Sequence, residues 1–400
     1  MCLIVQKFGG SSVKDAACIA RVASIIAKTY NEGNDVVVVL SAQGDTTDEL
    51  IEKSREVCGH VPPREMDMLI STGEQASVAL CAMALAELGI PAVSLNGYQA
   101  GILTDGVFSN ARIQTIHTTR ICSELAKRKV VLVTGFQGMG PGGDITTLGR
   151  GGSDTSAVAL AAALGARECR IYTDVDGVYT ADPRIVPNAR QLDAIGMPGM
   201  LELASQGAQV LHDRSVELAQ KHDVEVQVLS SMEVREGTRI GKAAQIEKRT
   251  VTGITRNTAL TRFDIRAHGG DPMLMRRIVH LIASCGARLD AVWQYGCAED
   301  MQRLCLTVPT VDAPALTREL SRCALSLDAV LTDEDIATVS VVGAGVMSDA
   351  GVLCEAMEAL AAEDIAVQGI ETGALRIALL LRREDTERAM RAIHARLFER

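Results

Sequence analysis

The amino-acid sequence predicts an α/β fold, a mostly parallel sheet sandwiched by helices, followed by two ferredoxin-like α+β modules. In the first part of the chain, short β-branched apolar runs alternate with helical stretches, as in sheets that helices cover on both faces. In the last part, a βαββα order of elements occurs twice. With about 100 to 200 residues per domain, a chain of 400 residues accommodates two or three domains.

The apolar runs of the first part are the predicted strands of the sheet. They lie at 3–8, 36–41, 92–95, 130–136, 168–173 and 224–229. Between them we expect a helix over 13–30, whose apolar residues recur at helical spacing and which Ser11 or Ser12 could cap. A second long helix is predicted over 64–88, and a third begins near Ser153.

The charged and glycine-rich segment 233–251 is predicted to connect the two parts. The first α+β module is expected to have strand 261–267, helix 272–285, strands 289–294 and 303–308, helix 312–325 and strand 327–331. The second is expected to have strand 337–343, helix 349–362, strands 365–371 and 374–381, and helix 384–398. The predicted domains are therefore 1–248, 252–335 and 336–400.

The composition excludes several classes of protein. A net charge of −10 and an aromatic content of 3% disfavour binding to nucleic acid. The longest uncharged stretches, such as Thr155 to Ala166, are shorter than the roughly 20 apolar residues of a membrane span, so no membrane association is expected. The 11 cysteines form no C-x-x-C pair, and no secretory signal is recognisable, which favours reduced thiols in the cytoplasm.

The first predicted strand ends in Lys7-Phe8-Gly9-Gly10-Ser11 and leads directly into a helix. The glycines allow close approach of an anion, free amides at the helix start point toward it, and Lys7 adds a positive charge. A tight turn between strand and helix, without any ligand, would have the same residues. The spacing matches neither the Walker motif nor G-x-G-x-x-G, so a phosphate site here would be of another kind.

The stretch from Thr146 to Ser156 is more specific. It places Arg150, Gly151, Gly152, Ser153 and Asp154 at the start of an alanine-rich helix. Ser153 or Asp154 could simply cap that helix, but capping requires neither the arginine nor the double glycine. The first turn of a helix is itself an anion receptor, so the cap and a binding site are compatible.

Three further segments carry polar residues with structural as well as functional explanations. Ser41 to Asp48 follows the second buried strand, where open α/β sheets bind ligands, although surface loops look the same. Glu74 lies in a largely apolar helix, where by itself it is best explained as an exposed glutamate on a solvated face, although the glycine beside it suggests close approach of another group. The acidic run 172–184 resembles an Asx-rich turn, and Ile185 stands where a calcium loop needs Glu. No zinc or serine-hydrolase motif occurs, and His212 is best explained as structural.

Taken together, these motifs resemble those of the aspartate kinases of the amino acid kinase family, in the same order over essentially the whole chain. The segments that carry the resemblance are KFGGSS, SAQGDTTDEL, STGEQ, GFQG, TTLGRGGSDTSAVALAAALGA, YTDVDGVYTADPR and LELASQGAQVLHDRSVELA. The C-terminal repeat resembles paired ACT regulatory domains, most clearly in VSVVGAG at 339–345. The resemblance implies an amino acid kinase catalytic domain over 1–248 and ACT-like domains over 252–335 and 336–400.

The resemblance also implies roles for individual residues. Lys7 and Asp154 are expected to be catalytic. Acceptor-binding residues are expected to be Ser41, Thr47, Glu74, Arg150, Gly151, Gly152 and Ser153. Nucleotide-binding residues are expected to be Lys7, Phe8, Gly9, Gly10, Ser11, Thr173, Asp174, Tyr179, Asp182 and Arg184. Regulatory residues are expected to be Asp271, Asp290, Gln294, Val346 and Met347.

The implied reaction is ATP-dependent phosphorylation of the β-carboxylate of L-aspartate, the first step toward lysine, threonine and methionine. Mg²⁺ is expected to be held mainly by the nucleotide phosphates, with no dedicated protein ligands. Paired ACT domains imply a homodimer or larger homo-oligomer. Two alternatives are an N-acetylglutamate, glutamate or uridylate kinase of the same family, and an amino-acid sensor with an inactive kinase domain.

The sequence departs from the family pattern mainly in the C-terminal half. Gln43 replaces a usual Met, and Asp213 a usual Pro. In the first ACT-like module, 270–274 lacks the glycine of the usual Asp-x-Pro-Gly, and 288–290 departs from Asn-x-Asp. The second module lacks His-Pro-Gly at 347–351. The sequence is therefore compatible with feedback inhibition by lysine, by threonine or by neither.

Overall fold

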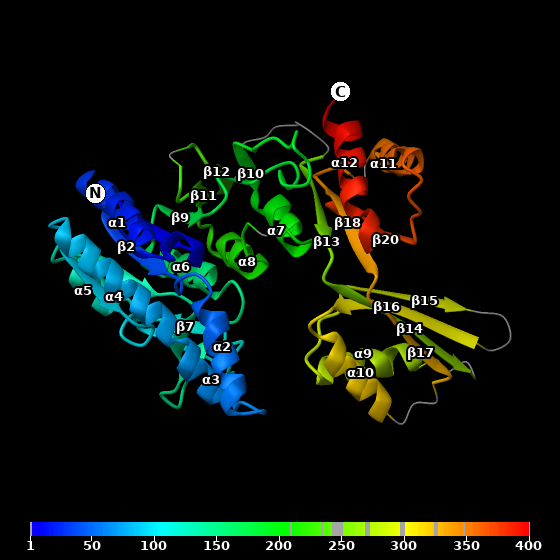
Figure 1. Ribbon diagram of the computed structural model, residues 1–400, viewed down its shortest axis with the longest axis horizontal. Coiled ribbons are helices and arrows are strands. Elements are labelled where there is room, and N and C mark those ends of the chain that lie inside the picture. Colours follow the sequence, from blue (N-terminus) through cyan, green and yellow to red (C-terminus); the bar gives the residue numbers. More distant parts are fainter. Residues whose placement is uncertain are drawn as a thin grey trace. The chain divides into compact units, whose positions relative to one another are not determined.

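The computed structural model describes residues 2–208, 210–233, 235–241, 251–268, 273–296, 301–323, 327–346 and 349–399. The chain forms two compact units, which are shown in Figure 1. The first comprises Met1–Thr180 and Arg190–Lys248, and the second comprises Ala181–Ala189 and Arg249–Arg400. The short segment Ala181–Ala189, called the excursion below, therefore belongs to the second unit although the residues before and after it in the sequence belong to the first.

The first unit is built on an eight-stranded sheet with the order β10-β12-β11-β9-β1-β2-β6-β3. Its strands are β1 (Leu3–Phe8), β2 (Asp35–Leu40), β3 (Ala92–Leu95), β6 (Val130–Thr134), β9 (Glu168–Thr173), β10 (Ala194–Gly196), β11 (Val226–Ser230) and β12 (Thr238–Gly241). All pairs are parallel except β11 with β12. This confirms the predicted mostly parallel sheet, and all the predicted strands belong to it.

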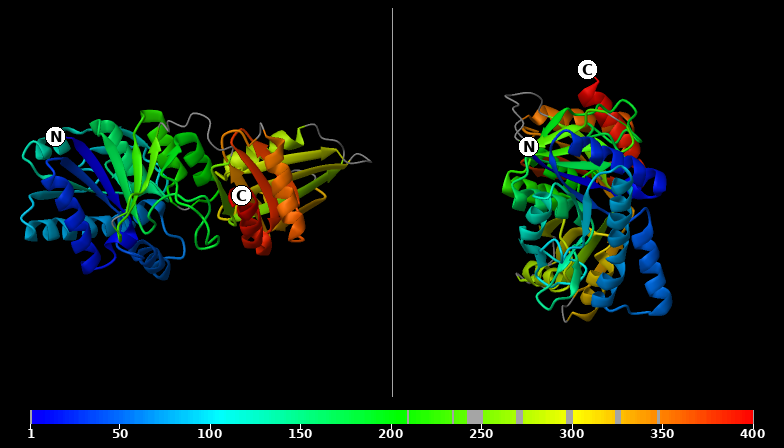
Figure 2. Two further views of the ribbon diagram at one scale, coloured as in Figure 1. Left: turned by 90° about the horizontal axis from the view of Figure 1, so that it is seen from above. Right: turned by 90° about the vertical axis from the view of Figure 1, so that its left-hand side faces the viewer.

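Helices cover both faces of this sheet, as Figure 2 shows from two further directions. Helices α1 (Ala16–Asn31) and α4 (Thr72–Glu87) pack on one face, and α6 (Gly152–Leu164) packs on the other beside α8 (Asp213–His222). The remaining helices of the unit are η1 (Gly10–Val13), α2 (Thr46–Val57), α3 (Pro63–Ile70), α5 (Thr119–Leu125) and α7 (Met197–Ser205). Because side chains alternate along β1, Phe8 faces α1 while Lys7 faces α6.

Two predicted helices differ in detail. Asp15, not Ser11 or Ser12, caps α1 by accepting a hydrogen bond from Cys18 N at 2.8 Å, because a 3₁₀ turn precedes the helix. The long helix predicted over 64–88 is divided at Ser71, whose carbonyl accepts a hydrogen bond from Gln137 Nε2 at 2.9 Å. A side chain from a neighbouring strand thus occupies an acceptor that a continuous helix would use internally.

The divided helical run Pro63–Glu87 has the length and hydropathy of a possible membrane span, and 44% of its most apolar window is buried in the structure. Val78, Cys81 and Leu85 of α4 lie in the core beside Val36 and Val38 of the sheet. The apolar character of α4 is therefore explained on this side by packing against α1 and the sheet.

A small four-stranded sheet, which the sequence analysis did not predict, lies at the edge of the first unit. Its strands are β4 (Ile102–Thr104), β5 (Ile113–Ile116), β7 (Gln137–Met139) and β8 (Ile145–Thr147). The strands are only three or four residues long, so they carry little of the periodic signal from which a strand is recognised. The loops that follow β4 and β8 reach the cleft described below.

The second unit contains two antiparallel four-stranded sheets with the orders β15-β16-β14-β17 and β13-β18-β20-β19. The first consists of β14 (Leu260–His268), β15 (Ala291–Gly296), β16 (Met301–Pro309) and β17 (Ala329–Asp333), with α9 (Leu274–Ser284) and α10 (Ala313–Arg322). The second consists of β13 (Gly253–Asn257), β18 (Ile336–Val342), β19 (Gly369–Gly373) and β20 (Arg376–Arg382), with η2 (Arg383–Asp385), α11 (Ala350–Ala362) and α12 (Thr386–Phe398). The predicted repeat of two α+β modules is confirmed.

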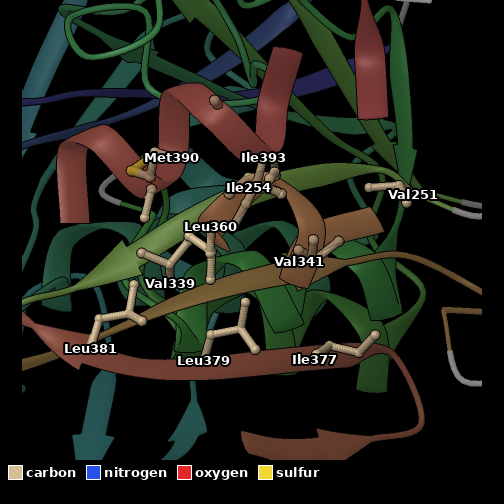
Figure 3. Close-up of a cluster of buried hydrophobic side chains, with 14 of the residues drawn as sticks. Val251, Ile254, Val339, Val341, Leu360, Ile377, Leu379, Leu381, Met390 and Ile393 are labelled. Atoms are coloured by element: carbon tan, nitrogen blue, oxygen red, sulfur yellow. The ribbon is translucent and has the colours of Figure 1, made fainter. Parts of the chain in front are cut away.

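Strand β13 is the main departure from the predicted modules. It precedes the first module in sequence, yet it pairs antiparallel with β18 of the second, with Ile254 opposite Val341. The first module is therefore inserted between two strands of the second. Figure 3 shows the resulting core, where Ile254 lies beside Val339 of β18 and Ile393 of α12.

The excursion Ala181–Ala189 contributes to this same core. Ala181, Ile185 and Val186 are buried in it, and Arg391 Nε of α12 donates a hydrogen bond to the carbonyl of Ile185 at 2.9 Å. The packing explains why these nine residues belong to the second unit although the chain on either side belongs to the first.

Candidate active site

A cleft of about 570 Å³ opens where the carboxyl ends of β1 and β2 meet the N-terminus of α6. Open α/β sheets bind ligands at such ends. Its lining includes all the predicted catalytic and acceptor-binding residues, namely Lys7, Ser41, Thr47, Glu74, Arg150, Gly151, Gly152, Ser153 and Asp154, together with Gly9 and Gly10 of the predicted nucleotide-binding residues. Residues from four separate sequence motifs therefore meet in one place.

Lys7 and Asp154 form an ion pair in the cleft. Lys7 is the second-last residue of β1, and its Nζ lies 2.6 Å from Oδ1 of Asp154 in the first turn of α6. Both side chains are about nine-tenths buried, at 11% exposure each. An ammonium group so held keeps a fixed position and a positive charge beside any anion in the cleft.

The N-terminus of α6 is packed too closely for side chains. Gly151 precedes it with φ of +67°, and a Cβ there would collide with the ring of His212. A Cβ on Gly152 would lie 2.9 Å from Leu148 and Phe136 side-chain atoms. Both glycines are thus required by packing, and they leave the amides of the first turn accessible to an anion.

Glu74 lies in the first turn of α4 and is 3% exposed. Its Oε1 accepts a hydrogen bond from Ala42 N at 3.2 Å, while its buried Oε2 has no partner. Burial raises the pKa of Glu74 to about 7, and the hydrogen bonds from backbone N–H groups oppose that rise. A buried carboxylate that faces a polar cleft with one free oxygen is suited to a cationic ligand.

The loop after β2 approaches the neighbouring elements closely. A Cβ on Gly73 would lie 2.7 Å from Cβ of Ala42, and one on Gly10 would lie 2.8 Å from the carbonyl oxygen of Ala42. The close approach that was expected beside Glu74 is therefore made by this loop of the protein, which packs against Gly73. The two glycines fix Ser41 and Thr47 between the end of β1 and Glu74.

Arg150 lines the cleft and is otherwise exposed. Within the described residues no ion pair of Arg150 is present. His212, by contrast, has structural contacts: it caps α8 by accepting a hydrogen bond from Arg214 N, and its ring covers Gly151.

The predicted nucleotide-binding residues are more dispersed. Phe8 is buried and stacks on Tyr172 with ring centroids 4.5 Å apart, and Ser11 is exposed outside the cleft lining. Thr173 ends β9 and Asp174 follows it, and Thr173 Oγ1 donates to Asp174 Oδ1 at 2.9 Å. Tyr179 OH donates to Asp176 Oδ1 at 2.8 Å.

Asp182 and Arg184 belong to the second unit and form an ion pair of 2.8 Å. The hydrogen bond from Arg184 lowers the pKa of Asp182. The structure thus brings the phosphate and acceptor residues together, and it leaves the nucleotide-binding role of Asp182, Arg184 and the preceding segment as a prediction.

The predicted regulatory residues lie in the second unit. Asp290 accepts a hydrogen bond from Thr307 Oγ1 at 3.0 Å, and Gln294 is exposed on β15. Val346 is 1% exposed, so its side chain packs in the core. Asp271 and Met347 lie outside the described residues.

Several residues of the cleft were missed by sequence reasoning. They are Ala42, Gly44, Asp48, Ile51, Met66, Ile70, Ser109, Phe136, Thr147 and Gly149. Ser109 and Phe136 have left-handed backbones, with φ of +65° and +68°, which is uncommon outside glycine. Such a conformation is not visible in the sequence. Asp48, Phe136 and Thr147, however, stand within the quoted motifs and could have been found there.

Comparisons with known proteins agree with this geometry. The amino acid kinase family matches residues 3–230, and the ACT domain matches residues 339–397. The aspartokinase of Bacillus sp. (strain MGA3) is 42% identical over 397 residues, which cover 98% of this chain and 97% of the relative.

Two crystal structures of E. coli aspartokinase III have the same fold. The complex with aspartate and ADP, in the R-state, superposes with a TM-score of 0.84 at 25% identity, over 99% of this chain and 100% of the other. The complex with lysine and aspartate, in the T-state, gives a TM-score of 0.74 at 25% identity, over 99% of each chain. The chain therefore belongs to the amino acid kinase family, as one of its aspartate kinases, and carries C-terminal ACT domains.

Proposed function

We propose that this kinase transfers the γ-phosphoryl group of ATP to the β-carboxylate of L-aspartate and forms 4-phospho-L-aspartate. The observation that carries the proposal is the pair of unmatched charges in the cleft, the buried Oε2 of Glu74 and the guanidinium of Arg150. Glu74 can receive the ammonium group of an amino acid, and the planar fork of Arg150 suits its α-carboxylate. The β-carboxylate then extends toward Lys7.

The chemistry requires alignment and charge relief more than proton transfer. A substrate carboxylate is ionised at pH 7 and is already the nucleophile, so no general base is needed. Lys7 and the amides at the start of α6 offset the charge on the transferred phosphoryl group. Asp154 keeps Lys7 in position through their ion pair.

Mg²⁺ bound with the nucleotide would supply charge neutralisation for the transferred phosphoryl group. The carboxylate of Asp154 in the cleft is compatible with Mg²⁺, because this ion prefers carboxylate and water oxygens in addition to phosphates. Asp154, which lines the cleft and pairs with Lys7, would hold water around the metal. Within the described residues no group of three or more His, Cys, Asp or Glu residues forms a site of its own.

We further propose that an end product of the pathway that starts with this reaction, toward lysine, threonine and methionine, regulates the enzyme through its ACT domains. Support comes from E. coli aspartokinase III, which was crystallised with lysine. Strand β15 lies at an edge of its sheet, where a second copy of the chain could pair with it, so we propose a homodimer or larger. The cysteines described are all free thiols, which supports a cytoplasmic location.

The alternative acceptors fit the cleft less well. An N-acetylated amino acid has no ammonium group, so it would leave the Oε2 of Glu74 buried without a partner. A sensor with an inactive kinase domain does not require the Lys7–Asp154 ion pair, which is intact.

Trapping of the acyl phosphate with hydroxylamine tests the proposal directly. Purified protein with Mg-ATP should form hydroxamate from L-aspartate, and glutamate and N-acetylglutamate should give little. Parallel reactions with lysine and threonine identify the effector by loss of signal. Hydroxamate from another acceptor, or none from folded protein, would contradict the proposed function.

A further inference from the structure

We propose that Asp67 and Arg214 are positioning residues for the acceptor side of the cleft, although neither lines it. Asp67 lies on α3 and Arg214 in the first turn of α8. The two residues hold the same pair of loops, 109–111 and 147–149, from opposite sides. The inference rests on the proposed role of Arg150, which directly follows the second loop.

Asp67 binds the N–H groups of the two loops. Its carboxylate is fully buried and accepts from Ser109 N at 2.9 Å and from Thr147 N at 2.8 Å, both at Oδ2. The hydroxyls of the same two residues donate to Oδ1, at 3.2 Å and 2.9 Å. A buried carboxylate satisfied by four such donors from two segments makes those segments depend on one another.

The backbone of Ser109 needs this support. Its φ is +65°, a left-handed conformation that costs an L-residue roughly 1 to 2 kcal/mol. The bonds to Asp67 offset that strain and direct the Ser109 side chain at the edge of the cleft. Strained residues of this kind persist where the surroundings fix them and are concentrated at functional sites.

Arg214 binds the carbonyl groups of the same loops. Its Nη2 donates to Ala111 O at 2.7 Å, and its Nη1 donates to Leu148 O at 2.8 Å. Ala111 N also donates to Thr147 O at 2.9 Å, which joins the loops directly. Leu148 lies two residues before Arg150.

Arg150 is therefore flanked by fixed positions. Before it, Gly149 has φ of +78° and a Cβ there would lie 3.2 Å from Ser109 O, so this turn is pressed against the first loop. After it, Gly151 is covered by the ring of His212. Two anchors, one through N–H groups and one through carbonyls, thus set the position from which Arg150 reaches an acceptor carboxylate. Lys7 lies on β1 and Asp154 within α6, and none of the hydrogen bonds of the two anchors is made to either residue.

This arrangement predicts a specific kinetic split. Asp67→Asn and Arg214→Lys each remove part of one anchor and should raise the KM for aspartate about 10- to 100-fold, because small misplacements of a binding group have effects of that size. The KM for ATP and the affinity for Mg-ADP, measured by calorimetry, should stay within about twofold, since the phosphate side is unchanged.

The control is Glu124→Gln on α5, which removes another buried carboxylate, one paired with Lys127 and Lys129 outside the cleft lining. It should leave the KM for aspartate unchanged. Folded Asp67→Asn and Arg214→Lys proteins with a normal KM for aspartate, or with KM values for both substrates raised equally, would overturn the inference.

Two further measurements keep the result unambiguous. If Asp67→Asn does not fold, the KM for aspartate of Arg214→Lys tests the inference alone. This substitution retains the positive charge of a half-buried side chain and loses the planar guanidinium that binds two carbonyl groups. Arg150→Ala is measured in parallel. An unchanged KM for aspartate in Arg150→Ala would contradict the proposed acceptor site itself, whereas a raised KM there with normal values in the anchor variants would contradict the positioning role alone.

Discussion

The two sides of the cleft differ in how their charges are matched. On the phosphate side, Lys7 and Asp154 pair with each other and are nearly buried. On the acceptor side, Glu74 has a buried oxygen without a partner, and Arg150 lines the cleft with its charge available. In the proposed function, the phosphate side is thus organised before any ligand arrives, and the acceptor side would be completed by a zwitterion. This difference separates residues that should control turnover from residues that should control aspartate binding.

The largest effect is expected on the phosphate side. Lys7→Ala should lower kcat about 100- to 1,000-fold, because it removes a cation that is preorganised for the transferred phosphoryl group. Asp154→Ala should lower kcat as well, since it leaves Lys7 unfixed. Steady-state rates at saturating aspartate and Mg-ATP measure both, with Lys28→Ala on the outer helix α1 as the control. Near-normal turnover in Asp154→Ala would remove that residue from the mechanism.

Arg150→Lys should act on binding instead. A lysine keeps the charge and loses one of two parallel hydrogen bonds to the α-carboxylate, a difference of roughly 1.5 to 3 kcal/mol, or about 10- to 100-fold in the KM for aspartate. We expect kcat to change much less. A titration of initial rate against aspartate distinguishes the outcomes, and an unchanged KM would mean that Arg150 does not clamp the substrate.

Glu74 gives a stability signature in the ligand-free enzyme. Its pKa is raised by burial to about 7 in the folded state from its ordinary value of 4.5, so between these pH values the folded protein binds more protons than the unfolded chain. The associated stability is complete below pH 4.5 and is lost as pH rises through 7, by at most about 3 kcal/mol.

Urea unfolding at pH 5 and at pH 7.5 tests this for the wild type and for Glu74→Gln. The wild type should lose more stability than the variant across that interval. Saturating aspartate should reduce the loss, because an ammonium partner favours the ionised carboxylate. Identical pH dependence in the two proteins would show that Glu74 titrates normally.

The smallest effect concerns the loop that carries Ser41. Gly73→Ala places a Cβ 2.7 Å from Cβ of Ala42, and overpacking of this kind costs roughly 1 to 3 kcal/mol. Gly199→Ala on α7 is the matched control, since the nearest atoms to its Cβ would be at 3.5 Å and alanine favours helix. Thermal unfolding should therefore show a lower Tm for Gly73→Ala and an equal or higher Tm for Gly199→Ala.

Periodicity and motif order predicted the sheet, the covering helices and the two C-terminal modules, because long apolar runs report burial directly. The insertion of one module into the other was not predictable. Strand β13 is a five-residue segment, and its partner β18 lies about eighty residues later in the sequence. The place of the excursion Ala181–Ala189 in the second unit was not predictable for the same reason. Its apolar residues are buried against elements that come much later in the sequence.

The site was predicted in its charged and glycine residues and missed in its supporting ones. Lys7, Glu74, Arg150 and Asp154 stand in motifs whose residue types are unusual at their positions. Asp67, however, resembles any acidic residue on an amphipathic helix, and only the structure reveals that it is fully buried among donors. Hydrogen bonds between distant loops depend on the completed fold, so no local pattern predicts them.

In the proposed function, Glu74 receives the ammonium group of aspartate. The most direct test compares kcat/KM for L-aspartate and N-acetyl-L-aspartate in the wild type and in Glu74→Gln. We predict that the wild type prefers aspartate strongly, and that the variant loses about 10- to 100-fold of that preference, since a charged hydrogen bond contributes roughly 1.5 to 3 kcal/mol. An equal preference in both proteins would contradict the claim.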